Sequence, residues 1–227
     1  MISVVVAVNN EEQFKQNVLS SPGLREIGAQ IVPCRGAKNA ADAFEAGKFQ
    51  SASPWILYCH QDVYFPEGSG LVIEKKLPSF SKDTILGFIG LAGALNSDVS
   101  LAGWVVDRVT NLMDYPESSS AVTIDELAVI LHRDCKYKID PRFGWHRWAT
   151  DLCLQAAFDG NYAKIIRVLL HHNSKHDNNW PPEVYASAEA LLDKYPQLSV
   201  IHTLCGSLTR AQKAVEAPRV LRRWSHR

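Results

Sequence analysis

The sequence lacks a charge imbalance, paired cysteines and any apolar run long enough to cross a bilayer. Its 24 Lys and Arg residues equal its 24 Asp and Glu residues, so no basic surface for nucleic acid is expected. The five cysteines are odd in number and form no CxxC pair, which argues against a zinc site and a disulfide framework. This usage favours a reducing, cytoplasmic compartment. No run approaches the roughly 20 apolar residues of a transmembrane segment.

Two nucleotide-binding signatures are also missing. No GxGxxG follows the first apolar run and no GxxxxGK[ST] occurs anywhere, which argues against a dinucleotide fingerprint and a P-loop. Residues 1–6 lack the basic region and cleavage site of a signal peptide, so we expect a strand there. A basic cluster near the C-terminal end is interpreted as a tail, with a partner or membrane-surface contact as alternatives. It consists of Arg219, Arg222, Arg223 and Arg227.

What is present is an alternation of apolar runs and helix-forming stretches. Strands are expected over residues 2–8, 30–33 and 55–60, with helices over 11–19 and 39–49 between them. This β-α-β-α-β order is typical of a nucleotide-binding half of an α/β fold. Further on, the pattern predicts strands over 85–95, 103–107, 122–131 and 164–170, a loop over 111–120, and helices over 148–158 and 181–195.

The third apolar run delivers three polar side chains to its carboxyl end: His60, Gln61 and Asp62. In open α/β sheets, ligands bind outside the carboxyl ends of the strands. An imidazole, a carboxamide and a carboxylate arriving there together favour metal or ligand chemistry. The alternative is that Asp62 caps the next turn and that His60 is a half-buried histidine with ordinary partners.

Two other places carry groups of the same kind: Asp151 in an expected helix, and His171-His172 at the end of an expected strand. Carboxylate and imidazole ligands can complete a shell for Mn²⁺ or a similar ion, which would neutralise a diphosphate leaving group. Asp151 would then be available as a general base. The alternatives are a favourable interaction of Asp151 with the helix dipole and an ordinary surface position for the histidines.

Four segments, in this order, resemble those of family-2-like glycosyltransferases of the GT-A fold. Residues 56–64 resemble an HQDVY segment, 123–127 a strand that the family carries, 144–156 a GWHxYGxDLCLQA segment, and 171–174 a closing HHS. The resemblance covers about residues 2–175. It implies an α/β fold of GT-A type: a single Rossmann-like domain with a mostly parallel mixed sheet flanked by helices. Residues 1–175 would form this core, and 176–227 a C-terminal helical extension with a basic tail.

The resemblance also implies an activity, the transfer of a sugar from a nucleoside-diphosphate-sugar to an acceptor hydroxyl with inversion. Asp62 takes the place of the metal-binding carboxylate of a DXD-type motif, and His172, with His171 as the alternative, that of a late metal ligand. Asp151 takes the place of the catalytic base. Trp145 and His146 would line the sugar and acceptor site. The nucleotide-sugar would contact Ala7, Val8, Asn9, Arg35, Asn39, His60, Gln61 and Asp62.

The implied cofactor is Mn²⁺ or Mg²⁺ and the implied donor a UDP- or GDP-sugar. The acceptor would be a glycan, a lipid-linked sugar or a protein, met in the cytoplasm or at the inner face of the membrane. The chain departs from the family in three places: His60 replaces the first carboxylate of the motif, Glu45 an asparagine, and Ala149 a glycine.

These departures leave a second hypothesis open, a catalytically silent nucleotide-sugar-binding or assembly protein on the same fold. A third, a nucleotidyltransferase, ranks last because its glycine-rich basic loop is missing after Val8.

Overall fold

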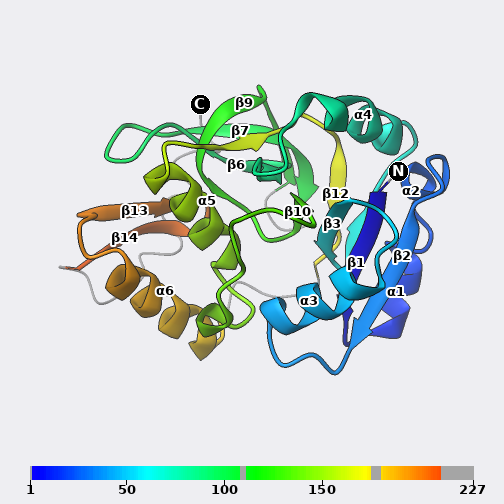
Figure 1. Ribbon diagram of the computed structural model, residues 1–227, viewed down its shortest axis with the longest axis horizontal. Coiled ribbons are helices and arrows are strands. Elements are labelled where there is room, and N and C mark those ends of the chain that lie inside the picture. Colours follow the sequence, from blue (N-terminus) through cyan, green and yellow to red (C-terminus); the bar gives the residue numbers. More distant parts are fainter. Residues whose placement is uncertain (1, 108–110, 175–179, 211–227) are drawn as a thin grey trace.

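The computed structural model describes residues 2–107, 111–174 and 180–210 (Figure 1). Within these residues a twelve-stranded sheet has the order β2-β1-β3-β10-β5-β11-β9-β6-β7-β12-β4, with β8 paired to β7. The strands are β1 (Ile2–Val8), β2 (Gln30–Arg35), β3 (Trp55–His60), β4 (Val63–Tyr64), β5 (Leu86–Gly87), β6 (Ile89–Ala92), β7 (Ser100–Asp107), β8 (Asn111–Tyr115), β9 (Ser118–Ile124), β10 (Ala128–His132), β11 (Ala163–Ile165) and β12 (Leu170–His172). A separate two-stranded sheet joins β13 (Val200–Thr203) to β14 (Gly206–Thr209).

The helices connect or flank these strands. They are α1 (Glu11–Gln16), α2 (Pro22–Arg25), α3 (Ala40–Gln50), α4 (Ser69–Lys76), α5 (Trp148–Phe158) and α6 (Pro182–Lys194), with 3₁₀ turns η1 (Leu77–Ser79) and η2 (Pro141–Phe143). None of the described helices combines the length and the apolar character needed to cross a membrane.

The expected β-α-β-α-β half is confirmed. Strands β2, β1 and β3 are parallel, and both helix starts are capped by asparagine. The side chain of Asn10 accepts from the backbone N–H of Glu12 and Gln13, and that of Asn39 accepts from Asp42. The strand-to-helix turns therefore lie at the carboxyl edge of the sheet.

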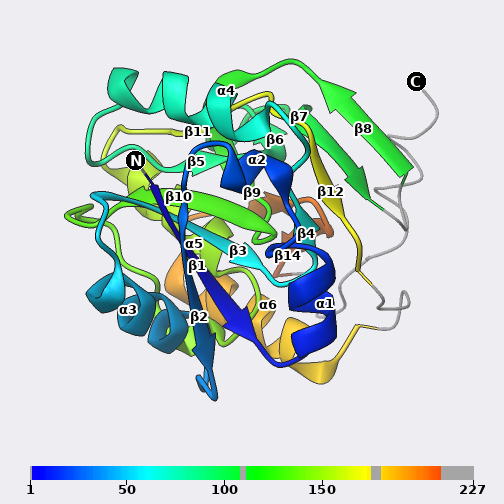
Figure 2. The same ribbon diagram turned by 90° about the vertical axis from the view of Figure 1, so that its right-hand side faces the viewer.

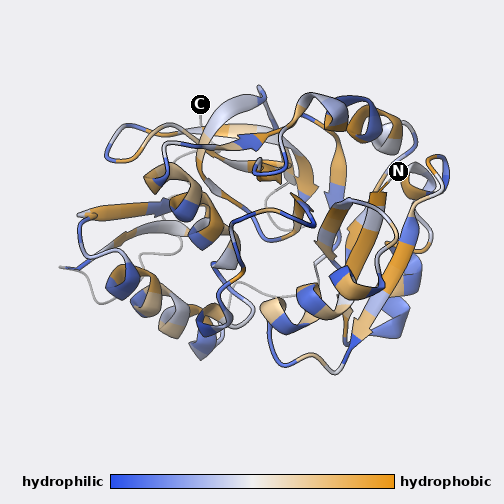
Figure 3. Cartoon of the chain, in the orientation of Figure 1, coloured by the Kyte–Doolittle hydropathy of each residue, from blue (hydrophilic) through white to orange (hydrophobic). Residues whose placement is uncertain are grey.

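The sheet is covered on both faces because side chains along a strand alternate in direction. Val4 and Val6 lie in one buried cluster with residues of α1, α2 and α4, whereas Val5 lies in another with residues of α3 and α5. Figure 2 shows α1 and α3 on opposite sides of β1 and β2. A Cβ atom at Gly47 would lie 2.3 Å from Val5 Cγ1, so this glycine lets α3 approach β1 closely. Apolar strands accordingly fill the middle of the molecule (Figure 3).

The fold class is confirmed as an α/β fold with a mixed sheet flanked by helices. Parallel pairing is less extensive than expected: in the described sheet it joins β1 to β2 and β3, β5 to β11, and β7 to β12, and the other pairs are antiparallel. Short connections join the antiparallel pairs β6–β7 and β7–β8, whereas the other antiparallel pairs bring together strands that lie far apart in the sequence.

Several element boundaries in that half were predicted wrongly. Residues 111–120, expected to be a loop, form β8 and the start of β9. The strands expected over 85–95, 122–131 and 164–170 are each interrupted. Within 122–131 the break is a turn in which Asp125 Oδ1 accepts from the backbone N–H of Leu127 at 2.9 Å. A polar residue thus ends β9 where the apolar pattern suggests continuity.

The C-terminal segment packs against the preceding domain. Leu191 of α6, Tyr195 directly after that helix and Ile201 of β13 belong to the same buried cluster as Leu152 of α5. In Figure 1, α6 and β13–β14 lie at the opposite end of the molecule from β1 and β2. The segment holds strands as well as a helix, and the domain boundary at residue 175 stays a prediction. The basic cluster at 219–227 lies outside the described residues.

Candidate active site

Most of the residues predicted to bind the donor gather where β1, β2 and β3 end. In the strand register Ala7 lies beside His60, and Val8 beside Arg35. Gln61 Oε1 accepts from the backbone N–H of Asn9 at 3.0 Å and of Asn10 at 2.9 Å, and its amide donates to Asn9 Oδ1 at 2.5 Å. Gln61 therefore holds the first strand-to-helix turn in place.

Arg35 and Asn39 lie near this edge with defined partners. The Arg35 guanidinium forms a two-point ion pair with Glu11 (2.5 and 3.1 Å), and the Arg35 hydrogen bond lowers the pKa of Glu11. Asn39 caps α3, and the next residue, Ala40, donates its N–H to the carbonyl of Gly144 at 3.0 Å. The loop that carries Trp145 and His146 is thereby tied to the donor half of the sheet.

A cluster with metal-ligand chemistry stands at the end of β3. One ligand atom each from His60, Asp62 and His172 lies within 4.8 Å of the others. His172 Nε2 is 3.5 Å from Asp62 Oδ1, and that oxygen, although buried, has no hydrogen-bond partner among the residues that the structure describes. A buried carboxylate oxygen without a partner is costly unless a cation or donor meets it. The donor set and this unmatched oxygen fit a divalent cation.

The structure separates the two histidines of β12. His172 faces Asp62, whereas the His171 ring packs against Tyr64, with ring centroids 5.7 Å apart. Neighbouring residues of a strand point to opposite faces, so only one of the pair can join the cluster. Of the two alternatives, His172 is the one that lies in the cluster with His60 and Asp62.

A fourth residue, Asp107 at the end of β7, supports the cluster. Its Oδ2 lies 2.6 Å from His172 Nδ1, in a register where Asp107 stands beside His172. A carboxylate that accepts from the outer ring nitrogen orients a metal-binding histidine. Burial alone would lower the pKa of His172, but Asp107 and Asp62 raise it to about 10. Burial would raise the pKa of Asp62, but His172 and His60 lower it to about 2.

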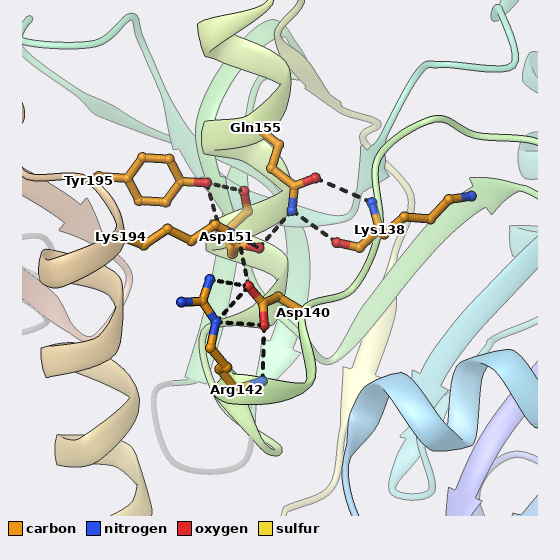
Figure 4. A network of polar contacts seen from close by, with 7 residues as sticks. All are labelled: Lys138, Asp140, Arg142, Asp151, Gln155, Lys194 and Tyr195. Atoms are coloured by element: carbon orange, nitrogen blue, oxygen red, sulfur yellow. Dashed lines mark hydrogen bonds and ion pairs between the residues drawn. The ribbon is translucent and has the colours of Figure 1, made fainter.

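Asp151, the predicted base, lies in a different environment. Its side chain is fully buried in the first turn of α5. Oδ1 accepts from the Tyr195 hydroxyl at 2.7 Å and lies 2.7 Å from Lys194 Nζ, and Oδ2 accepts from Gln155 at 2.7 Å (Figure 4). Lys194 continues the network to Asp140 at 2.9 Å. Both oxygens of Asp151 are thus occupied in joining α5 to α6.

A small pocket opens beside the turn between β9 and β10. It has a volume of about 40 Å³ and is lined by residues of that turn, the starts of α5 and α6, and the β13–β14 turn. Among them are Asp125, Glu126, His146, Arg147, Thr150 and Trp180. The backbone N–H of His60 donates to the carbonyl of Leu127 at 2.9 Å, so this turn lies next to the cluster of His60, Asp62 and His172. Of the two residues expected to wall the sugar site, His146 lines the pocket and Trp145 lies outside it, 39% exposed.

Comparison with protein families decides the wider assignment. The sequence profile of a family described as "Glycosyltransferase like family" matches residues 3–157. The chain belongs to this family. No curated protein matches it.

One solved structure agrees with the glycosyltransferase-like assignment in fold. TarS residues 1–349 from S. aureus, in complex with UDP-GlcNAc, share 8% identity with this chain at a TM-score of 0.52, covering 87% of this chain and 67% of TarS 1–349. A longer TarS structure shares 9% identity at a TM-score of 0.49, with 87% and 40% coverage. The same 1–349 fragment with UDP shares 9% at 0.48, with 85% and 65% coverage. At such identity the first match shows the GT-A-type fold alone.

The sequence reasoning did not select Asp107, which contacts His172, or Glu126, which lines the small pocket. Asp107 ends an apolar run just as Asp62 does, so the same signal could have found it. Glu126 lies in the segment 123–127 that carries part of the resemblance, but nothing local indicates that residues of α5, α6 and β13 close a pocket around it.

Proposed function

We propose that the protein transfers a sugar from a UDP- or GDP-sugar to an acceptor hydroxyl with inversion of the anomeric carbon, assisted by a divalent cation. The observation that carries the proposal is the His60–Asp62–His172 cluster at the carboxyl edge of the sheet in a glycosyltransferase-like domain. Ligands of α/β folds bind at this edge. The UDP-GlcNAc in the TarS structure supports a nucleotide-sugar as donor.

His60, Asp62 and His172 would hold the cation, whose charge would neutralise the departing diphosphate. Two imidazole nitrogens and one carboxylate oxygen suit Mn²⁺ better than Mg²⁺, which prefers oxygen ligands. Asp107 keeps a proton on His172 Nδ1 and so directs Nε2 toward Asp62.

The nucleotide would lie along the ends of β1 and β2, beside Ala7, Val8, Asn9 and Arg35. Gln61 contributes by fixing the backbone of Asn9, and Asn39 by starting α3 next to the loop of Trp145. The half-exposed Trp145 ring offers an apolar face to a sugar ring.

The acceptor, whether a glycan, a lipid-linked sugar or a protein, would approach from the side of His146. A cytoplasmic location, with the inner face of the membrane as a place of contact, belongs to the same proposal.

The sequence-based assignment of the base to Asp151 stays a prediction. A base must come within hydrogen-bond reach of the acceptor hydroxyl. For Asp151 this requires that its contacts with Tyr195, Lys194 and Gln155 open, because they occupy both oxygens.

The direct test of the proposal is turnover. The protein is incubated with Mn²⁺, UDP- and GDP-sugars and a panel of glycoside acceptors, and the released phosphates and the anomeric configuration of the product are measured. Release of nucleoside diphosphate with an inverted product is expected. Release of pyrophosphate in a parallel incubation with UTP or GTP and a sugar 1-phosphate would instead indicate a nucleotidyltransferase, and donor binding without release would indicate a silent binding module.

Asp107→Ala is expected to weaken Mn²⁺ binding by about 10–100-fold, the usual loss when a carboxylate behind a ligating histidine is removed. Electron paramagnetic resonance of free Mn²⁺ measures the affinity. Asp114→Ala is the matched control, because Asp114 lies on the neighbouring β8 and pairs with Arg167 instead. Equal affinities for the two variants would contradict the supporting role of Asp107.

A further inference from the structure

The turn between β9 and β10 presents two adjacent carboxylates, Asp125 and Glu126, next to the cluster that would hold the cation. Leu127 of this turn accepts the backbone N–H of His60 at 2.9 Å, and Asp125 braces the turn through the N–H of Leu127. The Asp125 charge is close enough to contribute to the raised pKa of His172. The turn is therefore fixed relative to the cluster.

Glu126 lines the small pocket, and Arg147 lines it with Glu126. The Arg147 side chain is 4% exposed; its Nη1 donates to Thr203 Oγ1 at 3.2 Å, but Nη2 is buried without a hydrogen-bond partner in the described part of the chain. A buried guanidinium nitrogen without an acceptor indicates that an oxygen atom belongs there. At about 10–15 Å³ for each water-sized group, a 40 Å³ pocket admits a hydroxyl group or a few waters, but not a whole sugar.

The environment of Glu126 suits proton transfer. Burial, and then the negative charge of Asp125, raise the pKa of Glu126 to about 8, while Arg147 acts in the opposite direction. General bases work best when their pKa lies near the operating pH. Asp151, by contrast, is fully buried with both oxygens occupied.

We propose that Glu126, and not Asp151, is the general base that takes the proton of the acceptor hydroxyl. In the same pocket, the Arg147 Nη2 would donate a hydrogen bond to an oxygen atom of the acceptor. This assignment rests on the proposed function. In the step, the acceptor O–H bond breaks and its proton passes to a Glu126 carboxylate oxygen. The acceptor oxygen forms a bond to the anomeric carbon. The bond from that carbon to the diphosphate oxygen breaks, and its electron pair leaves with the nucleoside diphosphate. Glu126 then releases the proton to solvent.

The test uses the full chain with Mn²⁺ and water as the acceptor. The release of nucleoside diphosphate is measured from UDP-GlcNAc, UDP-glucose, UDP-galactose and GDP-mannose. Glu126→Gln is expected to slow release by at least about 100-fold, within the usual contribution of a general base, while UDP binds as to the wild type. Glu117→Gln is the matched control, because Glu117 pairs with Lys76 on the surface. Glu126→Asp, which keeps a carboxylate, is expected to restore part of the rate.

The pH profile separates a base from a structural residue. Because the base must be deprotonated, the wild-type rate should rise with pH and level off above the pKa of Glu126, near 8, and the residual rate of Glu126→Gln should lack this rise. The other charged or titratable groups around Glu126 are Asp125 on the same turn, Arg147 and His146 before α5, Cys153 in α5 and Cys205 in the β13–β14 turn.

The outcomes distinguish this assignment from the proposed function. Turnover in Glu126→Gln at the wild-type rate, with Asp151→Asn inactive although folded, would overturn the assignment and leave the transferase intact. Binding of UDP or GDP by the wild type, without release of nucleoside diphosphate from any of the four donors either with water or with the panel of glycoside acceptors, would contradict both. A Glu126→Gln variant that loses UDP binding as well as turnover would show a structural role and would likewise overturn the assignment.

Discussion

Replacement of Asp151 by alanine is expected to lower the free energy of unfolding by about 3–5 kcal/mol, the usual cost of removing one partner of a buried ion pair. Asp151 is fully buried, and its carboxylate binds the Tyr195 hydroxyl, Lys194 Nζ and the Gln155 amide (Figure 4). Without it, these groups lose their shared acceptor and α6 loses a principal polar link to α5. The loss is a large fraction of the stability of a domain, typically about 5–15 kcal/mol.

Urea unfolding followed by circular dichroism measures this difference. The matched control is Asp159→Ala, since Asp159 ends the same helix and pairs with Lys136 at 2.9 Å at the surface. An exposed pair of this kind contributes at most about 1 kcal/mol. Equal, small losses for the two variants would contradict the structural role given to Asp151, and would return it to consideration as the base.

The second large effect is expected at Asp62. Asp62→Ala removes the carboxylate from the His60–Asp62–His172 cluster and leaves two imidazoles. Because a carboxylate supplies the anionic ligand, we expect Mn²⁺ affinity to fall by more than about 100-fold, beyond the range for a supporting residue, and sugar transfer to be lost with it.

Mn²⁺ binding without nucleotide measures this effect alone. Asp134→Ala is a suitable control, because Asp134 also stands beside a histidine, with its carboxylate 3.9 Å from His132 Nδ1, but outside the cluster. Unchanged Mn²⁺ affinity in Asp62→Ala would remove Asp62 from the cation site.

The first half of the fold could be predicted because its signals are local. A run rich in β-branched residues marks β1, a run of large apolar residues marks β3, and the asparagines that cap α1 and α3 stand directly before those helices. Gly47 and the alanines of α3 are small residues, and the face that they form packs closely on β1.

The second half could not be predicted in the same way because its strands depend on partners far away in the sequence. β10 pairs with β3, and β11 with β9, across long stretches of the chain, and the short strand β8 is held by its pairing with β7. The break between β9 and β10 arises from one side-chain contact of Asp125, which the apolar pattern hides.

In the candidate site, too, local sequence signals identify some residues, whereas others become apparent only through contacts between distant parts of the chain. Asp62 and His172 were singled out by their places at the ends of expected strands, and the resemblance implied their roles as metal ligands. Asp107 becomes relevant only through the register that sets β7 beside β12. Asp151 was recognised as a notable carboxylate, but its partners Lys194 and Tyr195 come from a helix 43 and 44 residues later. The chemical environment of a carboxylate is thus decided by tertiary contacts that the sequence around it does not reveal.

A calorimetric titration of the purified protein with UDP and with GDP, each with and without Mn²⁺, tests the central claim most directly. The account predicts that one of the two nucleotides binds, and that binding depends on Mn²⁺, because the diphosphate and the His60–Asp62–His172 cluster would share the cation. Binding of neither nucleotide with Mn²⁺ or Mg²⁺ would contradict a nucleotide-sugar site at this edge of the sheet.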